Sequence, residues 1–111
     1  QYRVMIRQPD FVTSDVLEAA IMNVSKKKSL SRFKDVRLES IEDGDCVQIL
    51  HVGPYDNESE SFMKVDEFCA AHNLQRANDE WHREIYLSDA RKVEPAKLKT
   101  VLRVQVKSMQ F

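Results

Sequence analysis

The segment at residues 82–88 (HREIYLS) carries the side chains of this sequence that are best suited to chemistry. In an extended strand, successive side chains point to opposite faces, so His82, Glu84 and Tyr86 share one face. The apolar Ile85 and Leu87 point the other way and are expected to pack against helices. We therefore expect a carboxylate, bracketed by two rings, on the sheet face opposite the helices.

Such a carboxylate has two chemical uses. Ionised, Glu84 attracts a cation or positions a water molecule, and protonated it donates a proton. Burial would raise its pKa, whereas a cationic ligand or a tyrosine hydroxyl would lower the pKa again. With Trp81 as a further ring, the face could form a concave and largely apolar pocket with one acid at its floor. The alternative is a solvated sheet face on which polar residues alternate with core residues.

A second candidate is Tyr55, in the turn within residues 51–60 (HVGPYDNESE). Gly53-Pro54 ends an apolar strand pattern, and a helix pattern follows. The turn either holds Tyr55 at the edge of the site or lets its ring pack against its own helix.

The elements that must position these residues follow from periodicity. Alternation predicts strands at residues 2–8, 36–41, 46–52, 82–88 and 100–107, with the second and third joined as a hairpin through Asp43-Gly44. The nearly continuous apolar character of residues 46–52 favours a central strand buried on both faces. A helix is expected from Thr13 or Ser14 to about Lys28, and another from the cap Asn57, with Glu60 completing a capping box, to Asn73. A short turn or helical piece is expected at residues 94–98.

The predicted order is therefore β-α-β-β-α-β-β. Helices that alternate with antiparallel strands usually gather on one face of the sheet, so we expect an α+β two-layer sandwich. The other face is then either wet or covered.

Length, charge and cysteine content exclude several classes. With 111 residues the chain has room for one domain, 1–111. Its 17 basic and 18 acidic residues leave no basic surface of the kind that binds nucleic acid. No apolar run reaches the roughly 18 residues of a membrane span. Two cysteines, Cys46 and Cys69, do not form a disulfide scaffold, so we expect both to be buried in a cytoplasmic protein.

Other catalytic or metal-binding arrangements fit poorly. Zinc ligands could be assembled only from scattered residues: Cys46, His51, Cys69, His72 and His82. None forms the tight pair usual in zinc sites, and Cys69 lies on the apolar stripe of its helix, where a thiol is inert. With Gly44 and Gly53 as the only glycines, a phosphate-binding loop is excluded. We therefore expect neither a metal nor a cofactor.

Several segments together resemble the GyrI-like small-molecule-binding domain, in its stand-alone bacterial form. They are residues 5–11 (MIRQPDF), 51–56 (HVGPYD) with the helix that follows, 82–89 (HREIYLSD) and 93–103 (VEPAKLKTVLR). The resemblance implies two pseudo-symmetric βαββ repeats with a ligand cleft between them. Residues 46–107 would form a complete second repeat, and residues 1–45 a shortened first part.

Carried over by motif, Glu84 is the central acid of the cleft, Tyr55 stands at its edge, and Tyr86 and Trp81 form its walls, with His82 beside them. The resemblance implies binding of aromatic, cationic drug-like compounds, for sensing or sequestering toxic molecules. An alternative is hydrolysis of strained cyclopropane-bearing genotoxins, with Glu84 and Tyr55 as the catalytic residues. Another is a protein-interaction domain similar to the gyrase inhibitors. The shortened first part suggests either a fragment of a longer two-repeat protein or a homodimer formed through the open sheet face.

Overall fold

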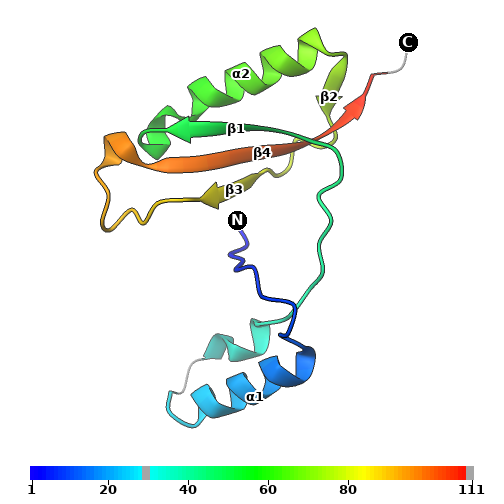
Figure 1. Ribbon diagram of the computed structural model, residues 1–111. Helices are drawn as coiled ribbons and strands as arrows, with labels where there is room; N and C mark the ends of the chain where they lie inside the picture. Colours follow the sequence, from blue (N-terminus) through cyan, green and yellow to red (C-terminus); the bar gives the residue numbers. More distant parts are fainter. Residues whose placement is uncertain (29–30, 110–111) are drawn as a thin grey trace. The chain divides into compact units, whose positions relative to one another are not determined.

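A computed structural model describes residues 1–28 and 31–109, and the chain divides into two compact units, Gln1–Ile41 and Glu42–Phe111 (Figure 1). The first unit contains helix α1, Ser14–Ser25, and the 3₁₀ helix η1, Ser31–Asp35. The Thr13 hydroxyl accepts a hydrogen bond from the Val16 amide at 3.3 Å, so the predicted N-cap is confirmed. The helix ends slightly before the expected Lys28.

The two strands predicted in this unit, at residues 2–8 and 36–41, do not form. Both stretches are irregular, and Tyr2, Val4 and Ile6 are 91%, 79% and 79% exposed. An alternating pattern becomes a strand only when a neighbouring strand satisfies its amide and carbonyl groups. No described segment pairs with either stretch, so the predicted hairpin is wrong, although Gly44 does adopt a left-handed φ of 67°.

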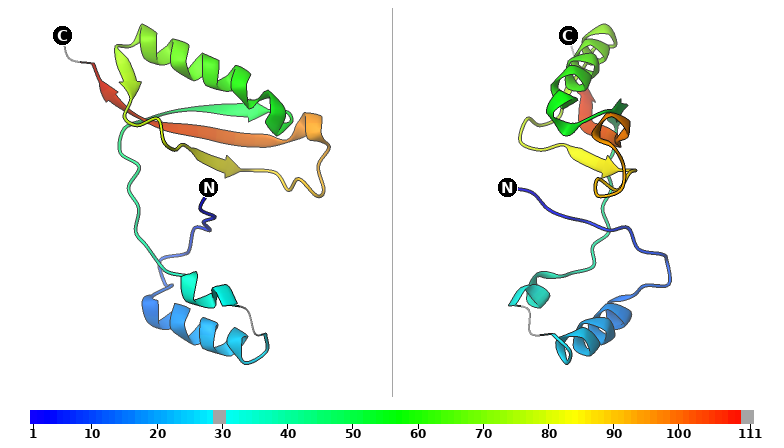
Figure 2. Two further views of the ribbon diagram at one scale, coloured as in Figure 1. Left: turned by 180° about the vertical axis from the view of Figure 1, so that it is seen from behind. Right: turned by 90° about the vertical axis from the view of Figure 1, so that its left-hand side faces the viewer.

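The second unit is an antiparallel sheet with one helix packed on one face, as Figures 1 and 2 show. Its elements are β1 (Cys46–Val52), α2 (Glu58–Ala71), β2 (Leu74–Arg76), β3 (Arg83–Tyr86) and β4 (Lys99–Ser108), with the short η2 (Tyr55–Asn57) and η3 (Pro95–Lys97). The predicted α+β class is confirmed. Strand β2 was not predicted, and its three residues are too few to show an alternation.

Strand β4, rather than β1, occupies the centre of the sheet. It pairs with β1 along one edge and with β3 and β2 along the other. The prediction that residues 46–52 form the central strand is therefore wrong. Their outward residues Leu50 and Val52 are 50% and 55% exposed, so apolar content on both faces did not indicate burial on both faces.

The core lies between α2 and one face of β4. Leu102 and Val104 of β4 are 0% and 2% exposed, and Val104 packs with Val65 and Cys69 of α2. Cys69 is thus buried as expected. Cys46 is only half-buried, and its thiol donates to the Asp43 carbonyl at 3.4 Å. At the other end of α2, Asn73 has a φ of 55°, which confirms the predicted left-handed terminator.

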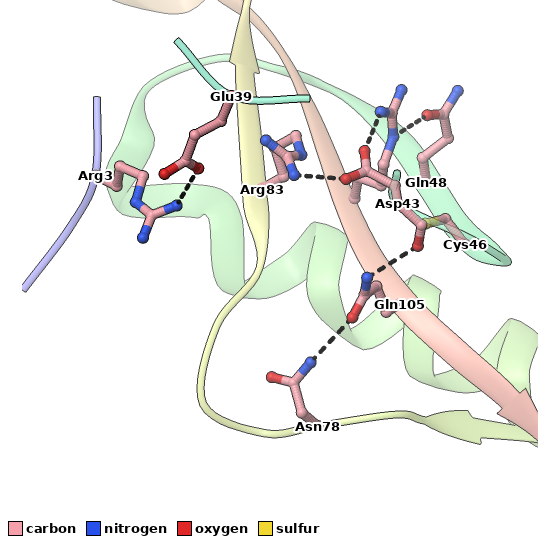
Figure 3. A network of polar contacts seen from close by, with 9 residues as sticks. Arg3, Glu39, Asp43, Cys46, Gln48, Asn78, Arg83 and Gln105 are labelled. Atoms are coloured by element: carbon pink, nitrogen blue, oxygen red, sulfur yellow. Dashed lines mark hydrogen bonds and ion pairs between the residues drawn. The ribbon is translucent and has the colours of Figure 1, made fainter. Parts of the chain in front are cut away.

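An ion-pair network fastens the turn before β1 to the sheet face opposite α2 (Figure 3). The Asp43 carboxylate accepts hydrogen bonds from Arg83 of β3 and from Arg103 of β4, the latter at 2.8 Å. Gln105 donates to the Asp43 carbonyl at 2.9 Å. The Arg103 hydrogen bond is the main reason that the pKa of Asp43 lies below its usual value.

Among the described residues, no helix is long and apolar enough to cross a membrane.

Candidate functional site

His82, Glu84 and Tyr86 lie on the side of the sheet on which α2 packs, which reverses the expected arrangement. In the β3–β4 register, Glu84 lies opposite Leu102 and Tyr86 opposite Thr100, and both of these β4 residues belong to the buried row beneath the helix. The three side chains do share a face, as alternation predicted. The prediction that Ile85 and Leu87 pack against the helices is wrong, and Leu87 is 59% exposed. Alternation shows which residues share a face but does not show which face the helix covers.

Glu84 lies at the centre of a cluster of polar and aromatic side chains. The Tyr86 hydroxyl donates to Glu84 Oε2 at 3.0 Å, and His82 Nε2 lies 3.6 Å from Oε1. A hydrogen bond with Glu58 is the largest influence that lowers the pKa of Glu84, and Tyr86 and His82 add to it, whereas burial opposes them. Glu84 is therefore held in its ionised form although it is half-buried.

Glu58 is a site residue that sequence reasoning missed. It is the first residue of α2, where a negative charge is favourable in any helix. Its carboxyl is close enough to Glu84 to respond to that charge, and its Oε2 atom is buried without a hydrogen-bond partner among the described residues. Burial first, and then Glu84, raise the pKa of Glu58 to about 7. The expected capping box is wrong, because Asn57 makes no side-chain cap hydrogen bond.

A signal for Glu58 existed in the sequence. Glu58 follows Tyr55 by three residues, which is about one helical turn, so any turn that brings Tyr55 to the site also brings Glu58 close to it.

The turn before α2 is fastened by His51, which is 4% exposed. His51 Nε2 lies 2.9 Å from the Pro54 carbonyl, which can only accept, so Nε2 carries a proton and donates. In the neutral ring Nδ1 then accepts from the Ser61 hydroxyl of α2 at 2.7 Å. Gly53 has a φ of 129°, a conformation that favours glycine, and its amide donates to the Leu98 carbonyl at 2.8 Å. The end of β1, the turn and the first turn of α2 are thus locked together.

These hydrogen bonds hold the turn so that Tyr55 faces β3. The Tyr55 and Tyr86 rings meet edge to face, with centroids 5.7 Å apart and an interplanar angle of 66°. The sequence left open whether Tyr55 packs against its own helix, and the ring instead contacts the strand that carries Glu84. Burial and the neighbouring Glu84 raise the pKa of Tyr86 to about 12, so its hydroxyl remains a donor at neutral pH.

His82 lies at the other end of the cluster, and Trp81 precedes it in the chain. The His82 ring packs edge-on against Phe62 of α2 at 4.7 Å between centroids. Trp81 is 48% exposed, and its amide donates to Asn78 Oδ1 at 3.0 Å. An open hollow of about 420 Å³ begins at His82 and is lined by Ser59, Phe62, Met63, Asp66, Arg76 and His82. Glu84 itself does not line this hollow.

Two of the residues considered as metal ligands, Cys69 and His72, have structural roles. Cys69 lies in the core, where burial raises the pKa of its thiol. His72 stacks on Phe68 with centroids 4.0 Å apart, and its Nδ1 lies 2.9 Å from the Phe68 carbonyl oxygen. Over residues 1–28 and 31–109, no group of three or more histidine, cysteine, aspartate and glutamate side chains is arranged to hold a metal ion.

Solved structures similar to this chain come from Listeria innocua. An uncharacterized conserved protein is 43% identical with a TM-score of 0.85, and the match covers 91% of this chain and 50% of that one. Two structures described as hydrolases are each 41% identical, with TM-scores of 0.82 and 0.80. They match 91% of this chain, and the matches cover 52% and 50% of their own chains. The chain thus spans about half the length of these structures.

A comparison with curated proteins found no match. The family model of the GyrI-like small-molecule-binding domain, in contrast, matches residues 7–107, which include β1, the Tyr55 turn, α2 and the Glu84 strand. Nearly the whole chain is covered, and the chain belongs to the family of GyrI-like small-molecule-binding domains.

Proposed function

We propose that the chain binds aromatic, cationic small molecules at Glu84, and that it acts by sequestering or sensing toxic compounds. The observation that carries the proposal is the carboxylate of Glu84, held ionised beside the contacting rings of Tyr55 and Tyr86. An anion attracts the charge of such a ligand, and tyrosine faces add cation–π attraction at close range. His82, at the far end of the cluster, and Trp81, which precedes it in the chain, would contact the remainder of the ligand.

The test compares a permanently charged probe with an uncharged probe of the same shape. N-methylphenanthridinium carries a fixed positive charge, and phenanthridine is its neutral counterpart at pH 7.5. We expect the chain to bind the cation more tightly, and Glu84→Gln to weaken that binding by about tenfold or more, since a direct charge contact is removed. Isothermal titration calorimetry measures both.

The matched control is Glu80→Gln, which removes the same charge from an exposed position shortly before β3. Its affinity for the cation is expected to stay within about twofold of the wild type, because exposed charges at a distance are screened by salt. Equal binding of the cation by wild type and Glu84→Gln would refute the proposal.

Hydrolysis is a second candidate, favoured by the contrast between the two carboxyl groups. Glu84 is held ionised and suits a general base, whereas Glu58, with a pKa raised to about 7, suits a general acid. Paired carboxyls whose environments separate their pKa values are a common arrangement for acid–base chemistry. Two of the similar structures are described as hydrolases.

The substrate we propose for this activity is a strained cyclopropane-bearing electrophile. Glu84 deprotonates a water molecule, whose oxygen bonds to a ring carbon while one ring C–C bond breaks. The electron pair of that bond passes to an electron-withdrawing group of the substrate, which takes a proton from Glu58, and the Tyr55 hydroxyl is a hydrogen-bonding partner. Mass spectrometry would follow the gain of one water by such a compound. Turnover that disappears in Glu84→Gln and persists in Glu80→Gln supports this activity. Tight binding without any turnover leaves binding as the function.

We also propose that residues 46–107 form one complete βαββ repeat, that residues 1–45 contribute a shortened one, and that two copies pair through the open sheet face. Leu50 and Val52 expose apolar side chains on that face. Light scattering coupled to size exclusion tests this pairing, and a monomer at high concentration refutes it.

A partner protein, as for the gyrase inhibitors, is the alternative occupant of the open sheet face. The free thiols of Cys46 and Cys69 are compatible with a cytoplasmic site of action.

A further inference from the structure

Glu58 and Glu84 are neighbouring carboxyl groups that come from different elements, and each shifts the pKa of the other. Glu58 is fixed at the first position of α2, and Glu84 is fixed in β3. An ionised carboxylate can only accept hydrogen bonds, so a hydrogen bond between two carboxyl groups requires a proton on one of them. Glu84 already accepts from Tyr86 and faces His82, whereas Glu58 Oε2 is buried without a partner among the described residues. The shared proton therefore belongs on Glu58.

We propose that Glu58 is the second acid of the binding site, that it donates its proton to Glu84, and that the pair meets a monocationic ligand with a single negative charge. This inference rests on the proposed function. It assigns Glu58 a role in ligand selection: the pair matches one positive charge, and a second negative charge becomes available only when Glu58 releases its proton.

The sign of the pH dependence follows from the groups that face Glu58. These are Glu84 and Tyr86 of β3, His82 directly before β3, and Tyr55 of η2. Tyr86 keeps its proton at neutral pH, because its pKa is about 12. As the pH rises through about 7, Glu58 ionises and the pair gains a second negative charge. Binding of a fixed cation then becomes tighter, on the order of three- to tenfold for one added unit charge nearby.

Binding must also release protons. A cation close to the pair favours the ionised form of Glu58, so the proton leaves Glu58 for the buffer when the ligand binds near pH 7. Calorimetry in two buffers that differ in ionisation enthalpy measures the number of protons released. If Glu58 has a purely structural role, Glu58→Gln releases as many protons as the wild type.

The direct experiment is a carbon-13 NMR titration of the glutamate side-chain carboxyls of the free protein. We expect one carboxyl to titrate near pH 7 in the wild type, and this signal to disappear in Glu58→Gln. In Glu84→Gln the same carboxyl should titrate at lower pH, because the negative neighbour is gone. Glu60→Gln, which removes an exposed carboxyl from the same helical turn, should leave the titration unchanged. Absence of any carboxyl that titrates above pH 6 in the wild type overturns the proposal.

The binding experiment separates this inference from the proposed function. Wild-type affinity for N-methylphenanthridinium should rise between pH 6 and pH 8, and affinity for phenanthridine should not. Glu58→Gln should still bind the cation, with a weaker pH dependence and less proton release than the wild type. If Glu84→Gln loses binding but Glu58→Gln keeps the full pH dependence of the wild type, the role of Glu58 is refuted and the proposed function stands. If the wild type binds neither probe, both are refuted.

Discussion

Replacing Ser61 by alanine tests the lock that presents Tyr55 to the site. Ser61 is 7% exposed, and its hydroxyl donates to Nδ1 of His51, which is 4% exposed. The substitution removes one hydrogen bond, worth about 1 kcal/mol net, and leaves a buried ring nitrogen unsatisfied, at about 1–3 kcal/mol if no water enters. Alanine is the better helix former by a few tenths of a kcal/mol, which offsets a small part. We expect a loss of about 2 kcal/mol in the free energy of unfolding.

Urea unfolding followed by the fluorescence of Trp81, the single tryptophan of the chain, measures this loss in the unit that contains the site. For a unit of this size, about 2 kcal/mol also lowers the melting temperature by roughly 8–16 °C. The matched control is Ser59→Ala, an exposed serine in the first turn of the same helix, which should stay within about 0.5 kcal/mol of the wild type.

A double-mutant cycle with His51→Ala isolates the contact from the rest of the ring. The coupling energy between the two positions should be about 1 kcal/mol, because each single variant breaks the same hydrogen bond. If Ser61→Ala unfolds at the same urea concentration as Ser59→Ala, the hydroxyl contributes nothing, and the account of how the turn is fastened is wrong.

Three further perturbations follow from the same unit. The pKa of Glu58 is raised from an ordinary 4.5 to about 7 in the folded state, so the native state binds more protons than the unfolded state between these pH values. The free energy of unfolding should therefore fall from pH 5 to pH 8 by on the order of 1–2 kcal/mol, and Glu58→Gln should flatten this slope in urea titrations. Gly53→Ala should cost about 1–3 kcal/mol although the added Cβ meets nothing within 4 Å, because a φ of 129° is strained for any residue with a side chain; unchanged stability would contradict this. Asp43→Asn should lower the free energy of unfolding by about 1–2 kcal/mol, since it removes the carboxylate that pairs with Arg83 and Arg103. This difference from the wild type should shrink below pH 4, because the wild-type Asp43, whose folded-state pKa is lowered, also becomes protonated in acid.

Periodicity predicted helices α1 and α2 and strands β1, β3 and β4, and it failed where a stretch has no partner strand or is too short to show a period. Helix α2 and strand β4 combine strong periodicity with burial, and both lie close to their predicted positions. Residues 2–8 and 36–41 alternate equally well but have no partner strand, and this information is not contained in their own sequence. Strand β2 has three residues, too few for a period.

The site was predicted in part for the same reason. Alternation correctly grouped His82, Glu84 and Tyr86, because it depends only on the geometry of one strand. The choice of face depends on β4, whose row of buried residues lies opposite Glu84 and beneath α2. Glu58 was missed because its position is local to a helix end, whereas its chemistry depends on a strand reached only through folding.

The face on which Glu84 lies changes what the acid can do. On an open sheet face, water would solvate the carboxylate, and its protonation would differ little from that of a free glutamate. Beneath α2, Glu84 loses part of its hydration and meets a second carboxyl at the start of the helix. Partial burial and proximity force one proton to be shared, so the charge of the pair changes near neutral pH instead of in acid. A site built in this way responds to a cation by releasing a proton, and this response requires the helix and the strand together.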